Sequence, residues 1–465
     1  MNMINVRRLT VMTFLGASML SGISAQVSPL QVDTLKETKI PDQWDLQSCI
    51  DYAKEQNITI RKNRITAVST QIDVKTAKAA LFPSLSFSTG HQVVNRPYQE
   101  TSSRVSGSEI ISSNSKTSYN GNYGLNASWT LYNGNKRLKT IQQEKLNNQM
   151  AELDVATSEN NIQESIAQVY IQILYAAESV KVNENTLQVS IAQRDRGQEL
   201  LNAGSIAKSD LAQLEAQVST DRYQLVTAQA TLEDYKLQLK QLLELDGENE
   251  MNIYLPALSD ENVLAPLPTK RDVYISALSL RPEIEASKLN VEASELGINI
   301  AKSSYFPTIS LSAGIGTNHT SGSDFTFGEQ VKNGWNNSIG LSVSVPIFNN
   351  RQTKSAVQKA KLQYETSMLS LLDEQKALYK TIESLWLDAN SAQQRYAAAN
   401  EKLKSTQISY ELISEQFNLG MKNTVELLTE KNNLLQAQQE QLQAKYMAIL
   451  NTQLLKFYQG DQLAL

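Results

Sequence analysis

Two very long stretches of this 465-residue chain lack proline, and this feature constrains the fold more than any other. The stretches are residues 98–255 and 347–465. Glycine is also scarce there: only Gly197 and Gly204 occur between 135 and 246, and only Gly420 between 341 and 459. Because compact domains reverse their chain about every dozen residues, stretches so poor in turn-forming residues predict very long helices. An ordinary compact enzyme is therefore improbable.

The N-terminus has the form of a secretory signal peptide at residues 1–25. Arg7 and Arg8 precede an apolar run from Leu9 to Ile23, and small residues follow up to Ala25, after which we expect cleavage. Cleavage removes two positive charges, so the net charge of −5 becomes −7, which excludes a general nucleic-acid binder. No later apolar run approaches the roughly 18 residues of a membrane helix, so any membrane crossing would use β-strands.

The single cysteine, Cys49, has no partner for an internal disulfide. It also lies too far from the cleavage site to be the lipidated first residue of a lipoprotein. Its helical spacing to Ile50 and Ala53 predicts a small, buried core residue.

The sequence contains an internal repeat. Leu81–Gly90 matches Tyr305–Gly314 at an offset of 224, and Leu131–Asn133 matches Ile347–Asn349 at an offset of 216. The first copy therefore carries eight extra residues in one loop. We expect a first repeat at 45–245, a linker at 246–270 and a second repeat at 271–465. Each copy should contain a helix, two strands separated by a loop, a very long helix, a tight turn and another helix.

One strand of each copy alternates strictly between apolar and polar residues. The apolar positions are Tyr119, Tyr123, Leu125, Ala127, Trp129 and Leu131 in the first copy, and Trp335, Ile339, Leu341, Val343, Val345 and Ile347 in the second. This pattern is typical of transmembrane β-strands, although half-buried strands of water-soluble proteins alternate too. The signal peptide and the lack of a membrane helix favour the transmembrane interpretation.

The long helices follow a heptad pattern, which predicts lengthwise helix–helix packing. Positions at alternating steps of three and four are Ile382, Leu385, Ala389, Ala392, Tyr396, Ala399, Leu403, Tyr410, Ile413 and Phe417. A helix over about 135–202 would extend roughly 100 Å at 1.5 Å per residue. Four strands per chain cannot close a membrane pore, so the chain must oligomerise, and the arithmetic allows a dimer or a trimer.

These features together resemble the TolC family of outer membrane efflux proteins over nearly the whole mature chain. The resemblance rests on the Phe-Pro-(Ser/Thr)-(Leu/Ile)-Ser segments at 82–86 and 306–310, the strand ends at 131–134 and 346–349, and glycines 204 and 420, each six residues before an acid.

The resemblance implies a mainly α chain with membrane β-strands that is internally duplicated. Three protomers would form a twelve-stranded β-barrel in the outer membrane of a Gram-negative bacterium, continuous with a periplasmic α-helical barrel of antiparallel coiled coils. A periplasmic adaptor (membrane fusion) protein and an inner-membrane efflux transporter are the implied partners. The sequence departs from the family in two ways. Residues 349–351 (Asn-Asn-Arg) replace a glycine pair, and without a lipidation cysteine the barrel alone would anchor the protein in the lipid.

The resemblance also implies a periplasmic gate where the helices reverse. Gly204 and Gly420 would form the hairpin tips. The acids that lie at the constricted entrance in the family correspond to Asp210 and Glu426 in this sequence. Lys422 would bridge to Asp210 and hold the entrance closed. A simpler alternative remains open, because an acid in the first turn of any helix is favoured by the helix dipole.

Four aromatic residues, Trp129, Tyr132, Trp335 and Phe348, are interpreted as membrane-interface anchors. Catalysis, cofactors and metals find no support. The only histidines, His91 and His319, lie near strand ends, and no cluster has metal-ligand spacing.

The resemblance thus implies the outer membrane channel of a tripartite efflux system, a passive conduit for small molecules. Type I protein secretion on the same fold is one alternative, and a non-conducting periplasmic coiled-coil protein is another.

Overall fold

The computed structural model describes residues 40–98, 102–106, 109–113, 116–246, 251–256, 263–321, 323 and 325–463. The expected signal peptide, residues 1–25, lies outside the described residues. Nearly all described residues belong to one unit, Pro41–Leu465.

The two halves of this unit have similar orders of elements. The first half contains α2 (Leu46–Gln56), α3 (Ile58–Ala79), β1 (Ser84–Asn95), β2 (Ser102–Ser106), β3 (Glu109–Ser113), β4 (Thr117–Asn133), α4 (Lys136–Asn202) and α5 (Lys208–Leu242). The second half contains α6 (Lys270–Leu280), α7 (Pro282–Ser303), β5 (Thr308–Thr320), α8 (Phe327–Asn333), β6 (Asn336–Ser344), α9 (Gln352–Asn418) and α10 (Thr424–Gln459). The β2–β3 hairpin lies in the longer loop of the first half, and α8 lies in the corresponding loop of the second.

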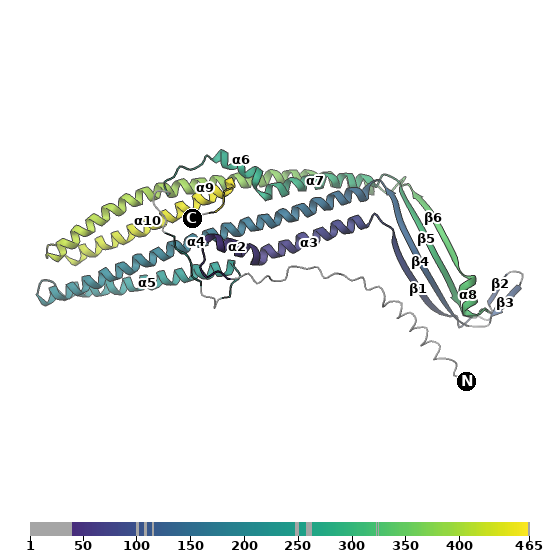
Figure 1. Cartoon of the computed structure of the whole chain (residues 1–465), viewed down its shortest axis with the longest axis horizontal. Helices are drawn as coiled ribbons and strands as arrows, with labels where there is room; N and C mark the ends of the chain where they lie inside the picture. Colours follow the sequence, from purple (N-terminus) through teal and green to yellow (C-terminus); the bar gives the residue numbers. More distant parts are fainter. Residues whose placement is uncertain are drawn as a thin grey trace, which may run out of the picture. The chain divides into compact units, whose positions relative to one another are not determined.

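The predicted very long helices are confirmed. α4 and α9 each run for 67 residues, which corresponds to roughly 100 Å. α4 packs along α5 and α9 packs along α10, and Figure 1 shows each pair as two neighbouring helices that reverse at a tight turn. We call α4–α5 the first hairpin and α9–α10 the second hairpin.

Heptad positions of α9 form its buried seam, as the sequence predicts. Buried members are Ile382, Ala389, Ala392, Tyr396, Ala399 and Phe417. The remaining members, Leu385, Leu403, Tyr410 and Ile413, are partly buried. Small alanines in the seam let α10 approach closely, which a continuous row of leucines would prevent.

A four-stranded antiparallel sheet has the strand order β1-β4-β5-β6. Its two central strands come from different halves, with Leu125 of β4 opposite Ile315 of β5. β6 ends at Ser344, although the alternating pattern continues to Ile347. Pro346 explains this shorter strand, because proline has no backbone N–H to donate to a ladder.

The largest core cluster joins both halves near the middle of the long helices. It contains Trp44, Cys49, Tyr170 and Ile173 from the first half and Leu450 and Leu454 from the second. Cys49 is fully buried, which confirms the predicted core role, and burial raises the pKa of its thiol to about 12. Among the described residues, no helix combines the length and apolar composition that crossing a lipid bilayer requires.

Candidate functional site: the two helical hairpins and the sheet

The turns of both hairpins have the same backbone geometry. Gly204 and Gly420 each have a φ of 74°, in the left-handed region that favours glycine. Gly204 N donates to Leu201 O at 2.9 Å, and Gly420 N donates to Phe417 O at 2.9 Å. These bonds satisfy carbonyls that a helix end leaves without partners. The equal geometry means that each long helix ends in a sharp, glycine-dependent reversal.

The predicted gate residues lie just past these turns, but their side chains pair locally. Lys422 Nζ lies 2.7 Å from Glu426 Oε1 within the second hairpin. The other Glu426 oxygen accepts from Asn423 N at 3.2 Å, and Asp210 Oδ2 accepts from Ala207 N at 3.1 Å. Both acids therefore cap the helix that they begin, which is the simpler alternative from the sequence. Within the described residues no ion pair joins Asp210 to Lys422, so the latch stays a prediction.

Lys422 also changes the acidity of Glu426. The hydrogen bond from Lys422, helped by the backbone N–H of Asn423, lowers the pKa of the Glu426 carboxyl below its ordinary value. The carboxylate therefore stays ionised, and its charge is matched by a lysine of the same hairpin.

A small apolar cluster holds the two hairpins together close to the turns. Leu214 of α5, Phe417 of α9 and Leu427 of α10 are almost fully buried against one another. Gln193 of α4 donates to the Tyr410 hydroxyl of α9 at 2.7 Å nearby. The hairpins thus contact each other through apolar packing and not only at their ends.

A buried polar triad, which the sequence analysis did not identify, also joins the hairpins. Lys431 of α10 donates to Asp221 of α5 and to Ser190 of α4, and Ser190 donates to Asp221. All three side chains are at most 3% exposed. Gln217 adds a bond to the second Asp221 oxygen at 2.9 Å.

A sequence signal for the triad exists in hindsight. Lys431 lies four residues after Leu427 and four before Leu435, and both leucines are buried. It therefore occupies the apolar stripe of α10, where a lone lysine indicates a buried partner of opposite charge. Among the ion pairs of the described residues, the Lys431–Asp221 pair of the triad has the two least exposed side chains.

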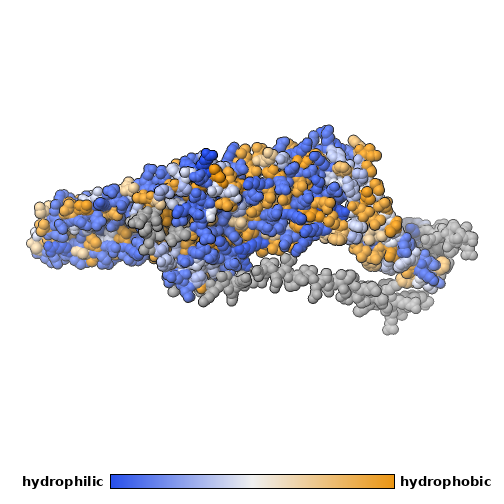
Figure 2. All heavy atoms as spheres, turned by 45° about the horizontal axis from the view of Figure 1, so that its top comes forward, coloured by the Kyte–Doolittle hydropathy of each residue, from blue (hydrophilic) through white to orange (hydrophobic). Residues whose placement is uncertain are grey.

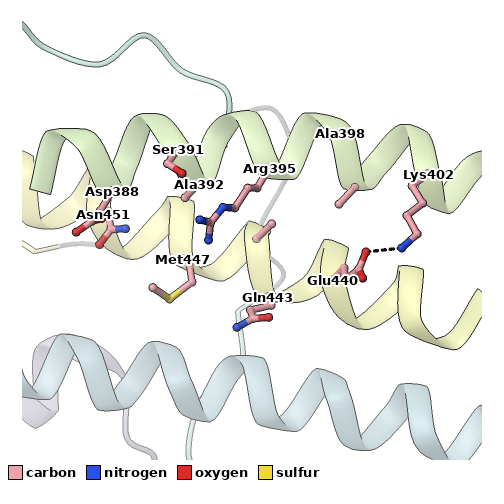
Figure 3. Close-up of a pocket in the computed structure, with 12 residues that line it drawn as sticks. Asp388, Ser391, Ala392, Arg395, Ala398, Lys402, Glu440, Gln443, Met447 and Asn451 are labelled. Carbon is pink, nitrogen blue, oxygen red and sulfur yellow. Dashed lines mark hydrogen bonds and ion pairs between the residues drawn. The ribbon is translucent and has the colours of Figure 1, made fainter. Parts of the chain in front are cut away.

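A groove of about 570 Å³ runs along the outside of the second hairpin. Figure 3 shows Arg395 and Lys402 reaching into it from α9, and Gln443 and Met447 from α10. Lys402 pairs with Glu440 at 2.7 Å across the groove. Arg395 has no ion-pair partner among the described residues.

The sheet exposes large apolar side chains on one of its faces. Members of this face include Leu85, Phe87, Leu125, Ile339, Leu341 and Val343, each between 39% and 81% exposed. Figure 2 shows apolar surface where the helices meet the strands and along part of the sheet. The opposite face carries Ser, Thr, Asn, Gln and Gly at most positions.

The four predicted interface aromatics lie near the two ends of the strands. Trp129 and Tyr132 lie near the C-terminal end of β4, which ends at Asn133. Phe348 lies just after β6, and its side chain is 83% exposed. Trp335 directly precedes β6 and is 57% exposed. Trp129 Nε1 donates to Leu81 O at 2.7 Å, so its indole N–H is satisfied at the strand–helix junction.

The strand-to-helix turns use two left-handed residues in each half. They are Gly134 and Asn135 before α4, and Asn350 and Arg351 before α9. Asparagine adopts the left-handed conformation more readily than most residues, and Asn350 does so where the resemblance to the family leads one to expect a glycine. Arg351, with a φ of 65°, was not anticipated in this conformation.

The two histidines lie on β1 and β5, the strands that flank β4 in the sheet. His91 of β1 and His319 of β5 both pair with Gly121 of β4, one on each side. The ring of Tyr119 stacks on His91 and meets His319 edge-on. Among the described residues, no group of three or more His, Cys, Asp or Glu side chains could hold a metal ion.

The chain resembles known proteins in both sequence and fold. The sequence matches the family described as "Outer membrane efflux protein" over residues 49–244 and 273–460, and the chain belongs to this family. Among curated relatives, the outer membrane efflux protein BepC of Brucella suis is 24% identical over 63% of this chain and 61% of its own length. The outer membrane protein TolC of Escherichia coli is 24% identical over 61% of this chain and 58% of its own length. The alignments thus span about three fifths of these two relatives.

A solved structure of CusC, whose description concerns transmembrane channel formation, superposes with a TM-score of 0.75. It is 19% identical and covers 90% of this chain and 92% of its own chain, so it supports the fold alone. The descriptions of the family and of BepC both name an outer-membrane efflux protein.

Proposed function

We propose that this protein is the outer-membrane channel of a tripartite efflux system, a passive conduit driven by an inner-membrane transporter through a periplasmic adaptor. The exposed apolar face of the sheet is the observation that carries the proposal. Ile339 is 81% exposed and Leu341 65% exposed on this face. Leaving such side chains in water is unfavourable, at about 25 cal/mol per Å², whereas lipid acyl chains would cover them.

The sheet also supports the trimer. β1 and β6 are its outer strands, and each presents one edge that pairs with no other described strand. In a bilayer, unpaired backbone groups cost several kcal/mol each, so a spanning sheet must close. Three copies would supply twelve strands, with β6 of one protomer beside β1 of the next.

The tips support docking of an adaptor protein. Leu419 is 75% exposed and Met421 is 70% exposed at the second turn, whereas the first turn has the small residues Ala203, Gly204 and Ser205. Exposed apolar side chains next to a charged pair are suited to a helical partner. In the assembled channel, Lys422 is also expected to bridge to Asp210, which closes the entrance.

A planar-bilayer recording tests the proposal. The purified protein should require detergent for extraction, migrate in a heat-modifiable manner and conduct. Lys422→Glu should raise the single-channel conductance, because it repels both acids at the entrance. Lys402→Glu is the matched control, since it reverses a lysine of similar exposure, 42% against 33% for Lys422, that pairs away from the turn, and it should leave conductance unchanged.

One result would contradict the channel proposal, and another would contradict only the latch. A protein that leaves the cell envelope without detergent and does not conduct would be the coiled-coil alternative. Unchanged conductance in Lys422→Glu would refute the latch but not the channel. Neighbouring genes discriminate efflux from type I secretion: a drug or metabolite pump indicates the first, and an ABC exporter with a secreted protein indicates the second.

A further inference from the structure

The four strands of the larger sheet contain no Asp, Glu, Lys or Arg on either face. The whole chain is 20% charged, so at its average composition every fifth strand residue would carry a charge. Contact with lipid explains the absence from the apolar face. It does not explain the polar face, because charged side chains are common on polar surfaces that meet water.

Small residues fill the polar face in successive rows across the sheet. Ser88 lies beside Gly124, which lies beside Gly316. In the neighbouring row Asn126 lies beside Gly314. From the row of Ser88 to that of Ser84, no side chain on this face is longer than Asn. Glycine weakens a strand, so repeated glycines on one face indicate a need for space.

The hydroxyl groups of this face bond within the sheet. Ser86 Oγ donates to Asn126 O at 3.4 Å, and Ser312 Oγ donates to Gly340 O at 3.3 Å. The Ser84 and Ser128 hydroxyls lie 2.8 Å apart. Hydroxyls that are satisfied by their neighbours offer few strong bonding sites to a passing molecule. Weak binding favours passage, because a solute must leave each site as readily as it enters.

We infer that this polar face is a wide, uncharged section of the conduit that does not select its cargo by charge. The inference rests on the proposed channel function. The cargo class that fits the section is organic molecules of either charge or none, limited by size. Any discrimination by charge would then have to arise outside the strands.

A charge introduced at Asn126 tests the inference. Asn126→Asp keeps the shape of the side chain and disturbs one long bond, the 3.4 Å contact from Nδ2 to Ser88 Oγ. In a trimer, the substitution would add a ring of three negative charges. The reversal potential is measured under a KCl gradient on the order of 0.01 to 0.1 M, where the Debye length is about 30 to 10 Å and the ring is felt across the lumen.

The expected result is a pair of shifts of opposite sign about the wild-type value. Asn126→Asp should move the reversal potential toward the potassium equilibrium potential, and Asn126→Lys should move it toward the chloride equilibrium potential. Asn126→Ser, the uncharged control, should leave it unchanged. Ser312→Asp, in the adjacent row, provides a second site and should reproduce the shift of Asn126→Asp.

Three results overturn the inference. If the conducting Asp and Lys variants keep the wild-type reversal potential, the face does not line the conduit, although the channel function stands. If only one of the Asp and Lys variants shifts the reversal potential, other charges already set the electrostatic potential in this section, and the lining does not act as an uncharged one. If the wild-type protein does not conduct at all, the proposed function fails together with the inference.

Discussion

The buried triad between the hairpins predicts a large and specific loss of stability. Asp221→Leu would leave the Lys431 ammonium group buried with Ser190 as its only polar partner, since both ionic side chains are at most 3% exposed. Removing one member of a buried ion pair typically costs about 3–5 kcal/mol, because the remaining charge keeps its desolvation penalty. Lys431→Met should cost a similar amount by leaving the Asp221 carboxylate unpaired.

The double variant Asp221→Leu/Lys431→Met should lose much less stability than the sum of the losses in the two single variants. Burial outweighs the hydrogen bond that Lys431 donates to Asp221 and lowers the pKa of Lys431 below its ordinary value. The charged lysine is therefore less favourable in the fold than in water, even beside its partner. Apolar residues of similar size commonly replace such a pair at little cost.

Hydrogen exchange of the backbone amides around residues 221 and 431 is the assay, because it reports local opening in the assembled protein. A loss of about 3 kcal/mol corresponds to roughly 10²-fold faster exchange. Lys402→Met is the matched control, since its pair with Glu440 is 42% exposed on both sides and should contribute about 0–1 kcal/mol. The reasoning would be refuted if the amides of the single variants exchange as slowly as those of the wild type. It would also be refuted if the double variant loses as much stability as the two single variants added together.

Three further predictions concern the turns. Gly134→Ala should lower thermal stability by about 1–3 kcal/mol, because Gly134 has a φ of 65° and an added Cβ would lie 2.7 Å from Ser303 O; an unchanged melting temperature would contradict this. Arg351→Asn should raise stability by up to about 1 kcal/mol, since asparagine adopts the left-handed conformation more readily; a lower melting temperature would argue against it. The pKa of Glu426 is lower in the folded protein than its ordinary 4.5, so its pairing with Lys422 stabilises the fold above that pH and is lost as the pH falls through the lowered pKa. The melting temperatures of wild type and Glu426→Gln should therefore differ at pH 7 and converge in acid; a constant difference would exclude this pairing as its cause.

The regular parts of the fold were predictable because they depend on local sequence and on period. The scarcity of proline and glycine predicted two very long helices, and the predicted bounds of α4 were right nearly to the residue. The heptad pattern predicted which side of α9 is buried. Alternation predicted the two faces of β4 and β6. Alternation predicted too late an end for β6. The pattern continues to Ile347, but the strand ends at Ser344 because Pro346 has no N–H to donate to the ladder.

Side-chain partners were harder to predict, because they depend on the packing of distant segments. Lys422 has acidic residues available on both hairpins, and sequence spacing alone does not decide between Glu426 and Asp210. In this chain the nearer partner, one helical turn away, forms the bond at 2.7 Å. The triad joins residues 190, 221 and 431, so its geometry appears only when three helices are placed together.

The duplicated halves are not independent folding units, and this follows from where their contacts lie. β4 of the first half pairs along its length with β5 of the second, so separating the halves would expose a long edge on each. In the helices, Arg281 of the second half is buried against Glu164 of the first at 2.6 Å, and Gln143 of α4 donates to Ala293 O of α7 at 3.0 Å. The largest core cluster also draws on both halves. The repeat is therefore a unit of sequence, whereas the unit of stability is the whole described chain, in which each copy supplies the surface that the other must bury.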